Sequence, residues 1–148
     1  MSDETGGIAK IPLQISRSCV IASIQIDLSD AVLRRFRMEL LELVDSSGAH
    51  GVILDVSGIE VMDYGDFEAL CKTMAMARLM GAPSVLAGLQ AGVVSSLVEL
   101  GAETEDIVAA MDLDDAFRVM DQLRATTDGD NPEDEHDERL QVAAPDQL

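Results

Sequence analysis

The stretch "ILDVSGIEVMDYGDFEAL", residues 53–70, places a short apolar run, a polar loop and an amphipathic segment in direct succession. The apolar run begins at residue 51, and its nearly continuous hydrophobicity is typical of a strand covered on both faces of a sheet. The amphipathic segment ends at Gly81, a residue type that often terminates helices. It carries apolar side chains at helical spacing: Phe67, Leu70, Cys71 and Met74. A buried strand followed directly by a helix is the repeating unit of an α/β fold.

Apolar runs and amphipathic segments alternate through the rest of the chain. Strands are predicted at residues 11–15, 19–26, 51–56 and 83–89, with a short further strand at 106–111. Helices are predicted at residues 30–45, 65–81, 91–101 and 113–124. After an initial hairpin-like pair of strands, this alternation predicts a mostly parallel sheet with right-handed crossovers. We therefore expect an α/β fold of about five strands with about four helices packed on the sheet. The first strand contains Pro12 and is expected at the edge.

Helical spacing also predicts which side chains fill the core. Ser29 is the expected N-cap of the first helix. The apolar stripe of that helix is Leu33, Phe36, Leu40 and Val44. In the second helix we expect three methionines to fill the core, with an adaptable interface as the alternative for some of them: Met74, Met76 and Met80. In the third helix three apolar residues fall on one face: Val93, Leu97 and Leu100.

The composition indicates one soluble domain. The chain has 148 residues, a usual length for a single domain, and 47% of them are hydrophobic. No apolar run approaches the roughly 20 residues that span a bilayer, and the N-terminus carries no apolar signal segment. We therefore expect a cytoplasmic protein. The formal net charge of −18 disfavours nucleic acid and acidic membrane surfaces as partners, because binding to them depends on Lys and Arg.

The composition changes at both ends of the chain. Residues 1–10 are polar and are predicted to form a flexible N-terminus. Residues 125–148 carry eight acids and one base, a net charge of −7. Low hydrophobicity combined with this charge predicts an acidic disordered tail. The folded domain is therefore expected over residues 11–124.

The sequence lacks the motifs of common enzyme and cofactor sites. It contains no glycine-rich nucleotide-binding motif, no zinc-protease motif and no serine-hydrolase motif. The only histidines, His50 and His136, and the only cysteines, Cys19 and Cys71, do not form a metal-binding pattern. We expect no enzymatic activity, no cofactor and no metal. The polar cluster at the predicted strand ends, where α/β proteins place their sites, comprises Ser57, Glu60, Asp63 and Asp66.

Several segments taken together resemble one family. The opening stretch is followed by "MARLMGAPSVLAGLQAGVVSSLVELG" and then by "AAMDLDDAFRVM". In this order and spacing they resemble a STAS domain. The pieces "ARLMGA" and "LVELG" are most similar to the RsbS-like scaffold proteins of stressosomes, which belong to the anti-sigma factor antagonist class. The resemblance covers residues 11 to about 123, which is essentially the whole predicted domain.

The resemblance implies a STAS-type mixed sheet and a regulatory role without catalysis. RsbS-like proteins hold an RsbT-like Ser/Thr kinase until they are phosphorylated, and they co-assemble with RsbR-like paralogues into a large signalling complex. The chain would then act by partner switching in a stress response, as a homo-oligomer or within a hetero-oligomeric complex. The same fold serves stand-alone anti-sigma factor antagonists that bind an anti-sigma kinase, which is the alternative. A ligand-binding sensor would need an enclosed pocket, which the sequence does not indicate.

The resemblance also locates a switch at the start of the second helix. The family carries a Ser or Thr there, because backbone N–H groups and the helix dipole favour an anion such as phosphate. Tyr64 occupies that position here, and its hydroxyl stands too far out for a Ser/Thr kinase. The switch surface around Tyr64 comprises Asp63, Gly65, Asp66 and Glu68. Asp63 is also the expected N-cap, with Asp66 at the third helical position.

Two hypotheses about this switch follow. In the first, which we favour, the chain cannot be phosphorylated at position 64 and holds its kinase constitutively, or holds it until another residue is modified. In the second, Asp66 and Glu68 partly imitate the phosphate and prevent tight capture. Ser96 is a candidate second phosphosite, because RsbR-like paralogues carry a phosphorylatable Thr in the similar segment. Ser95 is its neighbour, and a polar residue early in a helix is the plainer interpretation of Ser96.

Overall fold

The computed structural model describes residues 9–129. The chain forms nine elements in the order β1 (Leu13–Ser16), β2 (Cys19–Ser23), α2 (Asp30–Ser47), β3 (Gly51–Asp55), α3 (Tyr64–Leu79), β4 (Ser84–Ala87), α4 (Ala91–Glu99), β5 (Ala109–Ala110) and α5 (Leu113–Gly129). Helix α5 continues past residue 124, where we expected the folded domain to end. The expected flexible N-terminus and acidic tail otherwise lie almost wholly outside the described residues.

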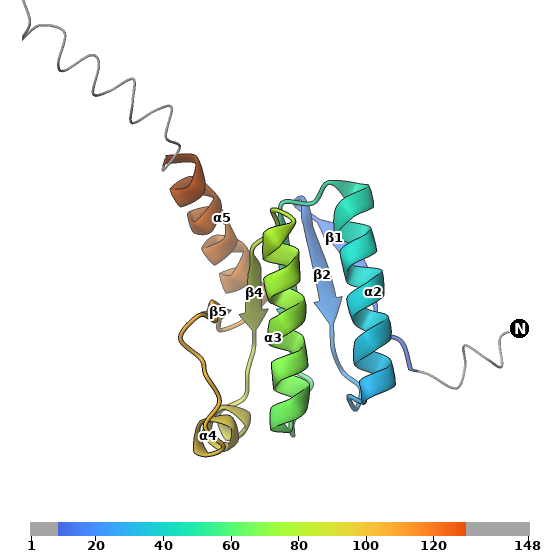
Figure 1. Cartoon of the computed structure of the whole chain (residues 1–148). Helices are drawn as coiled ribbons and strands as arrows, with labels where there is room; N and C mark the ends of the chain where they lie inside the picture. The colour runs from blue at the N-terminus through green and yellow to red at the C-terminus, as the bar shows by residue number, and fades with distance from the viewer. Residues whose placement is uncertain (1–8, 130–148) are drawn as a thin grey trace, which may run out of the picture.

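The strands form one sheet in the order β1-β2-β3-β4-β5. Strand β1 pairs antiparallel with β2, and the other three pairings are parallel. The expectation of a mixed, mostly parallel sheet of five strands with four helices is therefore confirmed for the described residues. Strand β1 lies at the edge, directly after Pro12, as expected. Helix crossovers join the parallel strands, so β2, β3 and β4 all end at the same side of the molecule (Figure 1).

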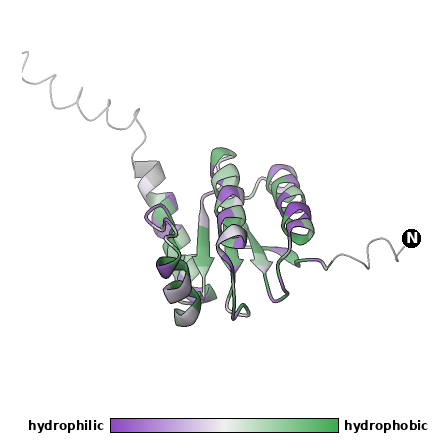
Figure 2. Ribbon diagram, turned by 60° about the horizontal axis from the view of Figure 1, so that its bottom comes forward, coloured by the Kyte–Doolittle hydropathy of each residue, from purple (hydrophilic) through white to green (hydrophobic). Residues whose placement is uncertain are grey.

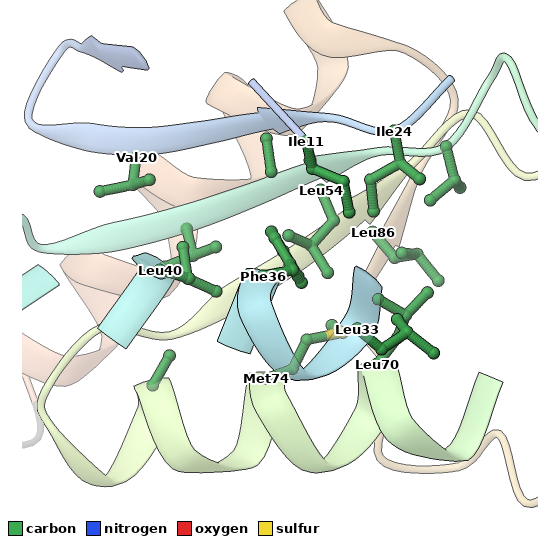
Figure 3. Packing of buried hydrophobic residues seen from close by; sticks show 14 of the residues in the cluster. Ile11, Val20, Ile24, Leu33, Phe36, Leu40, Leu54, Leu70, Met74 and Leu86 are labelled. Carbon is green, nitrogen blue, oxygen red and sulfur yellow. The ribbon is translucent and has the colours of Figure 1, made fainter. Parts of the chain in front are cut away.

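The helices cover the two faces of the sheet unequally. Helices α2 and α3 pack on one face, and α4 contributes to the same large apolar cluster, which includes Phe36, Leu40, Leu54 and Leu70 (Figure 3). Helix α5 packs on the other face over β3, β4 and β5, where Met120 meets Ile53 and Val85. Figure 2 shows the resulting layers, with hydrophobic strands between helices that carry hydrophilic segments. A strand buried on both faces is uniformly apolar, which explains the continuous apolar runs of the sequence.

The helix ends follow local chemistry, with two corrections to the predicted core. Ser29 caps α2 as expected, accepting a hydrogen bond from the backbone N–H of Val32. Leu100, predicted to be in the core, is 57% exposed because α4 ends at Glu99 and Leu100 begins the turn away from the sheet. Only Met74 of the three methionines is buried, whereas Met76 and Met80 are 38% and 44% exposed near the end of α3.

Within residues 9–129 no helix is both long enough and apolar enough to span a membrane.

Cys19 is buried, Cys71 is half-buried, and both are free thiols. Burial is the main cause that raises the pKa of each thiol. Cys71 therefore packs against the core rather than lying fully within it, and neither cysteine has the lowered pKa of a reactive thiolate.

Candidate functional site

The candidate site lies where the parallel strands end. The loop that follows β3, residues 56–63, begins with a compact turn held by Asp55. Its Oδ1 accepts hydrogen bonds from the Ser57 backbone N–H at 3.0 Å and from the Ser57 hydroxyl at 2.7 Å. The Gln90 side chain, just before α4, donates to the Ser57 carbonyl at 2.8 Å. The loops after β3 and β4 are therefore joined by a hydrogen bond, which fixes their relative position at the site.

Gly88 makes that close approach of the two loops feasible. It has a φ of +81°, in the left-handed region that glycine adopts without steric cost. A Cβ at Gly88 would lie only 2.8 Å from Cβ of Ser57. Any larger residue would separate the loop after β4 from the loop after β3.

Helix α3 begins as the sequence predicts. Asp63 is the N-cap, in extended backbone conformation, and its Oδ1 accepts a hydrogen bond from the Asp66 backbone N–H at 2.8 Å. Tyr64 is therefore the first residue of the helix, beside N–H groups that have no partner within the helix. Gly65 follows, exposed, and a Cβ there would make only an ordinary contact with Asp63. The backbone geometry that would favour an anion at position 64 is present.

Tyr64 is half-exposed and faces two carboxylates. Glu68 lies one turn further along α3, and Glu103 approaches from the loop between α4 and β5. The charge of Glu68 is the main cause that raises the pKa of the Tyr64 hydroxyl, followed by partial burial, Glu103 and a hydrogen bond with Glu68. The hydroxyl therefore stays protonated well above neutral pH and serves as a hydrogen-bond donor. Sequence reasoning missed Glu103, because it is distant along the chain.

Asp66 lies in a more crowded acidic setting. Partial burial is the main cause that raises the pKa of its carboxyl, and the charges of Asp63 and Asp30 and a hydrogen bond with Asp63 raise it further. The structure thus brings Asp63 and Asp66 together as expected. It adds Asp30, from the first turn of α2, which the sequence did not associate with this site.

An open hollow of about 360 Å³ lies beside the start of α3, between the loop after β2 and the loop after β3. We call it the acidic hollow. It is lined by Gln25, Ile26, Asp27, Leu28, Gly58, Ile59, Glu60, Val61, Asp63 and Asp66. Of the predicted polar cluster it gathers Glu60, Asp63 and Asp66, whereas Ser57 lies outside it. The wall from the loop after β2 was not predicted, although the parallel pairing of β2 with β3 requires the two loops to be neighbours.

The other candidate residues lie apart from the acidic hollow. Ser96 is exposed in the middle of α4, as is Ser95, and in the described part of the chain neither side chain makes a hydrogen bond. His50 is exposed immediately before β3, whereas His136 lies outside the described residues. No group of His, Cys, Asp and Glu among residues 9–129 has the arrangement of a metal site.

Comparisons with known proteins agree with this fold. Residues 10–125 match the model of the STAS domain. A search of curated proteins found no significant match. Solved structures that resemble the chain include a Ser-to-Glu variant of RsbS from Moorella thermoacetica, with 24% identity and a TM-score of 0.68 over 78% of this chain and 97% of that one.

Two further structures show how widely the fold is shared. A chain from a structure of the stressosome, described as a signal integration and transduction hub, has 26% identity and a TM-score of 0.67 over 76% of this chain and 98% of its own. A putative anti-sigma factor antagonist from Thermotoga maritima has 17% identity and a TM-score of 0.60 over 74% of this chain and 93% of its own. At such identity the second likeness concerns the fold alone.

Proposed function

The chain belongs to the STAS domain family, and on this premise we propose that it is a non-enzymatic scaffold in a stress-signalling partner-switching module. It binds an RsbT-like Ser/Thr kinase in the cytoplasm and co-assembles with RsbR-like paralogues into a stressosome. The similarity to RsbS and to a stressosome chain, each covering nearly the whole of the other protein, supports this choice within the family.

The start of α3 is the observation that carries the proposal. Asp63 caps the helix by accepting a hydrogen bond from the Asp66 backbone N–H, and the N–H groups of Tyr64 and Gly65 have no partner within the helix. Tyr64 stands at the position where the family carries a phosphorylatable Ser or Thr. A phenolic hydroxyl stands at the far end of a rigid ring, so a kinase that phosphorylates Ser or Thr cannot present ATP to it in the same geometry. The chain therefore holds its kinase without release through this residue.

Two features of Asp66 and Glu68 argue against permanent imitation of phosphate. The pKa of Asp66 is raised by burial and neighbouring acids, which shows that its surroundings disfavour the charged form. Glu68 is the fifth residue of α3, beyond the helix start, and its charge is the main cause that raises the pKa of the Tyr64 hydroxyl. Each acid carries at most one negative charge, on a residue other than 64, whereas a phosphate on residue 64 would carry nearly two.

A titration calorimetry experiment with the purified RsbT-like kinase tests this proposal. We expect the native chain and the Tyr64→Ser variant both to bind the kinase when nucleotide is absent. After incubation with ATP, only Tyr64→Ser should take phosphate and lose affinity. Failure of the native chain to bind, while Tyr64→Ser binds, would reject constitutive holding.

The alternative is a stand-alone antagonist of an anti-sigma kinase, a role that the same fold also serves. Size distinguishes the two. Mixed with an RsbR-like paralogue, a stressosome scaffold elutes from gel filtration as a very large assembly, whereas an antagonist stays small.

We further propose Ser96 as a second phosphosite, since it is exposed on α4. Mass spectrometry of the chain after incubation with the kinase, compared with Ser96→Ala, tests this.

A further inference from the structure

The acidic hollow combines apolar walls with an acidic rim. Ile26 and Leu28 form part of one wall, and both are half-buried. Val61 belongs to the opposite side and is 87% exposed, an unusual position for a large aliphatic residue. At the base, a Cβ on Gly58 would lie 2.9 Å from Cγ of Gln25, so the two loops already touch there. The result is an open slot between two loops that touch at Gly58 and Gln25.

The acids of the rim have no cationic partner in the described residues. They are Asp27, Glu60, Asp63 and Asp66. The three ion pairs within residues 9–129 use only Glu39 and Asp115 as acids. Like charges gathered around one hollow repel one another, and besides burial the charge of Asp63 helps to raise the pKa of Asp66. A cation placed in the slot would relieve this repulsion, whereas an anion would increase it.

We propose that the acidic hollow binds an arginine side chain presented by the partner kinase. The proposal deepens the proposed function and rests on it, because it names the chemistry by which the kinase is recognised. Arginine fits better than lysine for two reasons. Its planar guanidinium is weakly hydrated and tolerates apolar walls, and its fork of donors can engage two carboxylates at once. Its aliphatic stem lies along Ile26, Leu28 and Val61.

Other occupants fit the slot less well. A bare metal ion requires a cluster of ligands, and residues 9–129 contain no such cluster. An apolar small molecule would leave the rim acids without partners. A hollow of about 360 Å³ lies at the small end of the range for ligand pockets and is open to solvent, so it would leave much of a large ligand uncovered.

Two acetylated, amidated tripeptides provide a direct probe. One is Leu-Arg-Leu, and the other carries citrulline, a neutral near-isostere of arginine, in place of Arg. Each is titrated into the isotope-labelled full-length chain while backbone amide shifts are followed by NMR. We expect the Arg peptide to shift the amides of Gly58, Val61 and Asp66 and the citrulline peptide to leave them nearly unchanged. Equal shifts with both peptides, or shifts spread over all surface acids, would overturn the proposal.

A matched pair of variants separates this site from general acidity. Asp63→Asn with Asp66→Asn removes two rim charges, and Asn remains an effective N-cap. Glu42→Gln with Asp45→Asn removes two exposed charges near the opposite end of α2, outside the hollow. The rim variant should lose the peptide-induced shifts, and the control variant should retain them. Equal loss in both variants would show that net charge alone attracts the peptide.

The same variants, titrated with the purified kinase, test the site in its full context. We expect the rim variant to bind about tenfold more weakly than the control variant and with less salt dependence. If both variants bind the kinase equally well, the kinase does not use the hollow and the inference fails, although the proposed function stands. If the native chain binds the Arg peptide at the hollow but binds no kinase, the proposed function fails, whereas the ability of the hollow to bind an arginine side chain is upheld.

Discussion

Asp63 contributes both a hydrogen-bond acceptor and a charge at the start of α3, and two substitutions separate these contributions. Asp63→Ala removes the acceptor for the Asp66 backbone N–H and should lower the free energy of unfolding by about 1 kcal/mol. Asp63→Asn keeps an acceptor and should change stability much less. Urea denaturation of both variants checks the prediction. Equal losses in both would mean that the charge, rather than the acceptor, stabilises the helix start.

Asp66 should make the fold more stable at mildly acidic pH. Its pKa is raised in the folded chain by burial and by two neighbouring acids, so the folded state binds its proton more tightly than the unfolded state does. The ionised Asp66 carboxylate therefore destabilises the fold. This destabilisation is fully present above the pKa of Asp66 in the folded chain and disappears as the pH falls through that value.

Asp66→Asn should therefore raise the melting temperature at neutral pH. The difference between Asp66→Asn and the native chain should shrink as the pH falls below the folded pKa of Asp66. Melting curves across this range check the sign. A constant difference at every pH would show that lost packing or dipole effects, not titration, separate the two proteins.

Among the connecting loops, a pair of glycines tests how tightly the site is built. Gly48 and Gly88 both have positive φ, at 68° and 81°. A Cβ on Gly48 would meet nothing within 4 Å, whereas one on Gly88 would lie 2.8 Å from Ser57. Gly48→Ala should therefore cost roughly 1 kcal/mol from backbone strain alone.

Gly88→Ala should cost more than Gly48→Ala by about 1–3 kcal/mol, because the loops after β3 and β4 must separate as well. Thermal melts of the two variants measure this excess. A second consequence is specific to the site, since Gly88→Ala should also disturb the NMR signals of residues 56–60. Equal stability of the two variants would mean that the loops yield freely.

Periodicity predicted the elements well because strands buried on both faces are uniformly apolar and the helices are amphipathic. Its failures lie at helix ends and at Met76, which is inside α3 but off the buried stripe of Phe67, Leu70 and Met74. Leu100 and Met80 continue a helical pattern beyond the residue where each helix ends, so spacing assigned them to a face that no longer exists. At the site, the cap Asp63 was predictable from local sequence. Glu103 and the wall formed by Ile26 and Leu28 were not, since they depend on which loops the sheet brings together.

In the molecule as a whole, acidic residues far outnumber basic ones, and few of them form ion pairs. The chain has 28 acids and 10 Lys and Arg residues, yet the described part forms only three ion pairs. Excess charge of one sign keeps a protein soluble but destabilises its compact state through self-repulsion. The acidic hollow gathers four of these acids beyond the carboxyl ends of β2 and β3. A basic partner that binds there would gain affinity and would also reduce the repulsion between the acids.

This imbalance predicts that salt stabilises the fold. Raising sodium chloride from about 10 to about 150 mM shortens the Debye length from roughly 30 to 8 Å and screens long-range repulsion, while few favourable ion pairs are weakened. The free energy of unfolding should rise by about 1 kcal/mol, or a few degrees in melting temperature. The same titration near the isoelectric point of about 4.1 is the control, because net repulsion vanishes there and with it the salt effect. A similar rise at both pH values would point to general salting-out, and a fall at neutral pH would show that local ion pairs outweigh the net charge.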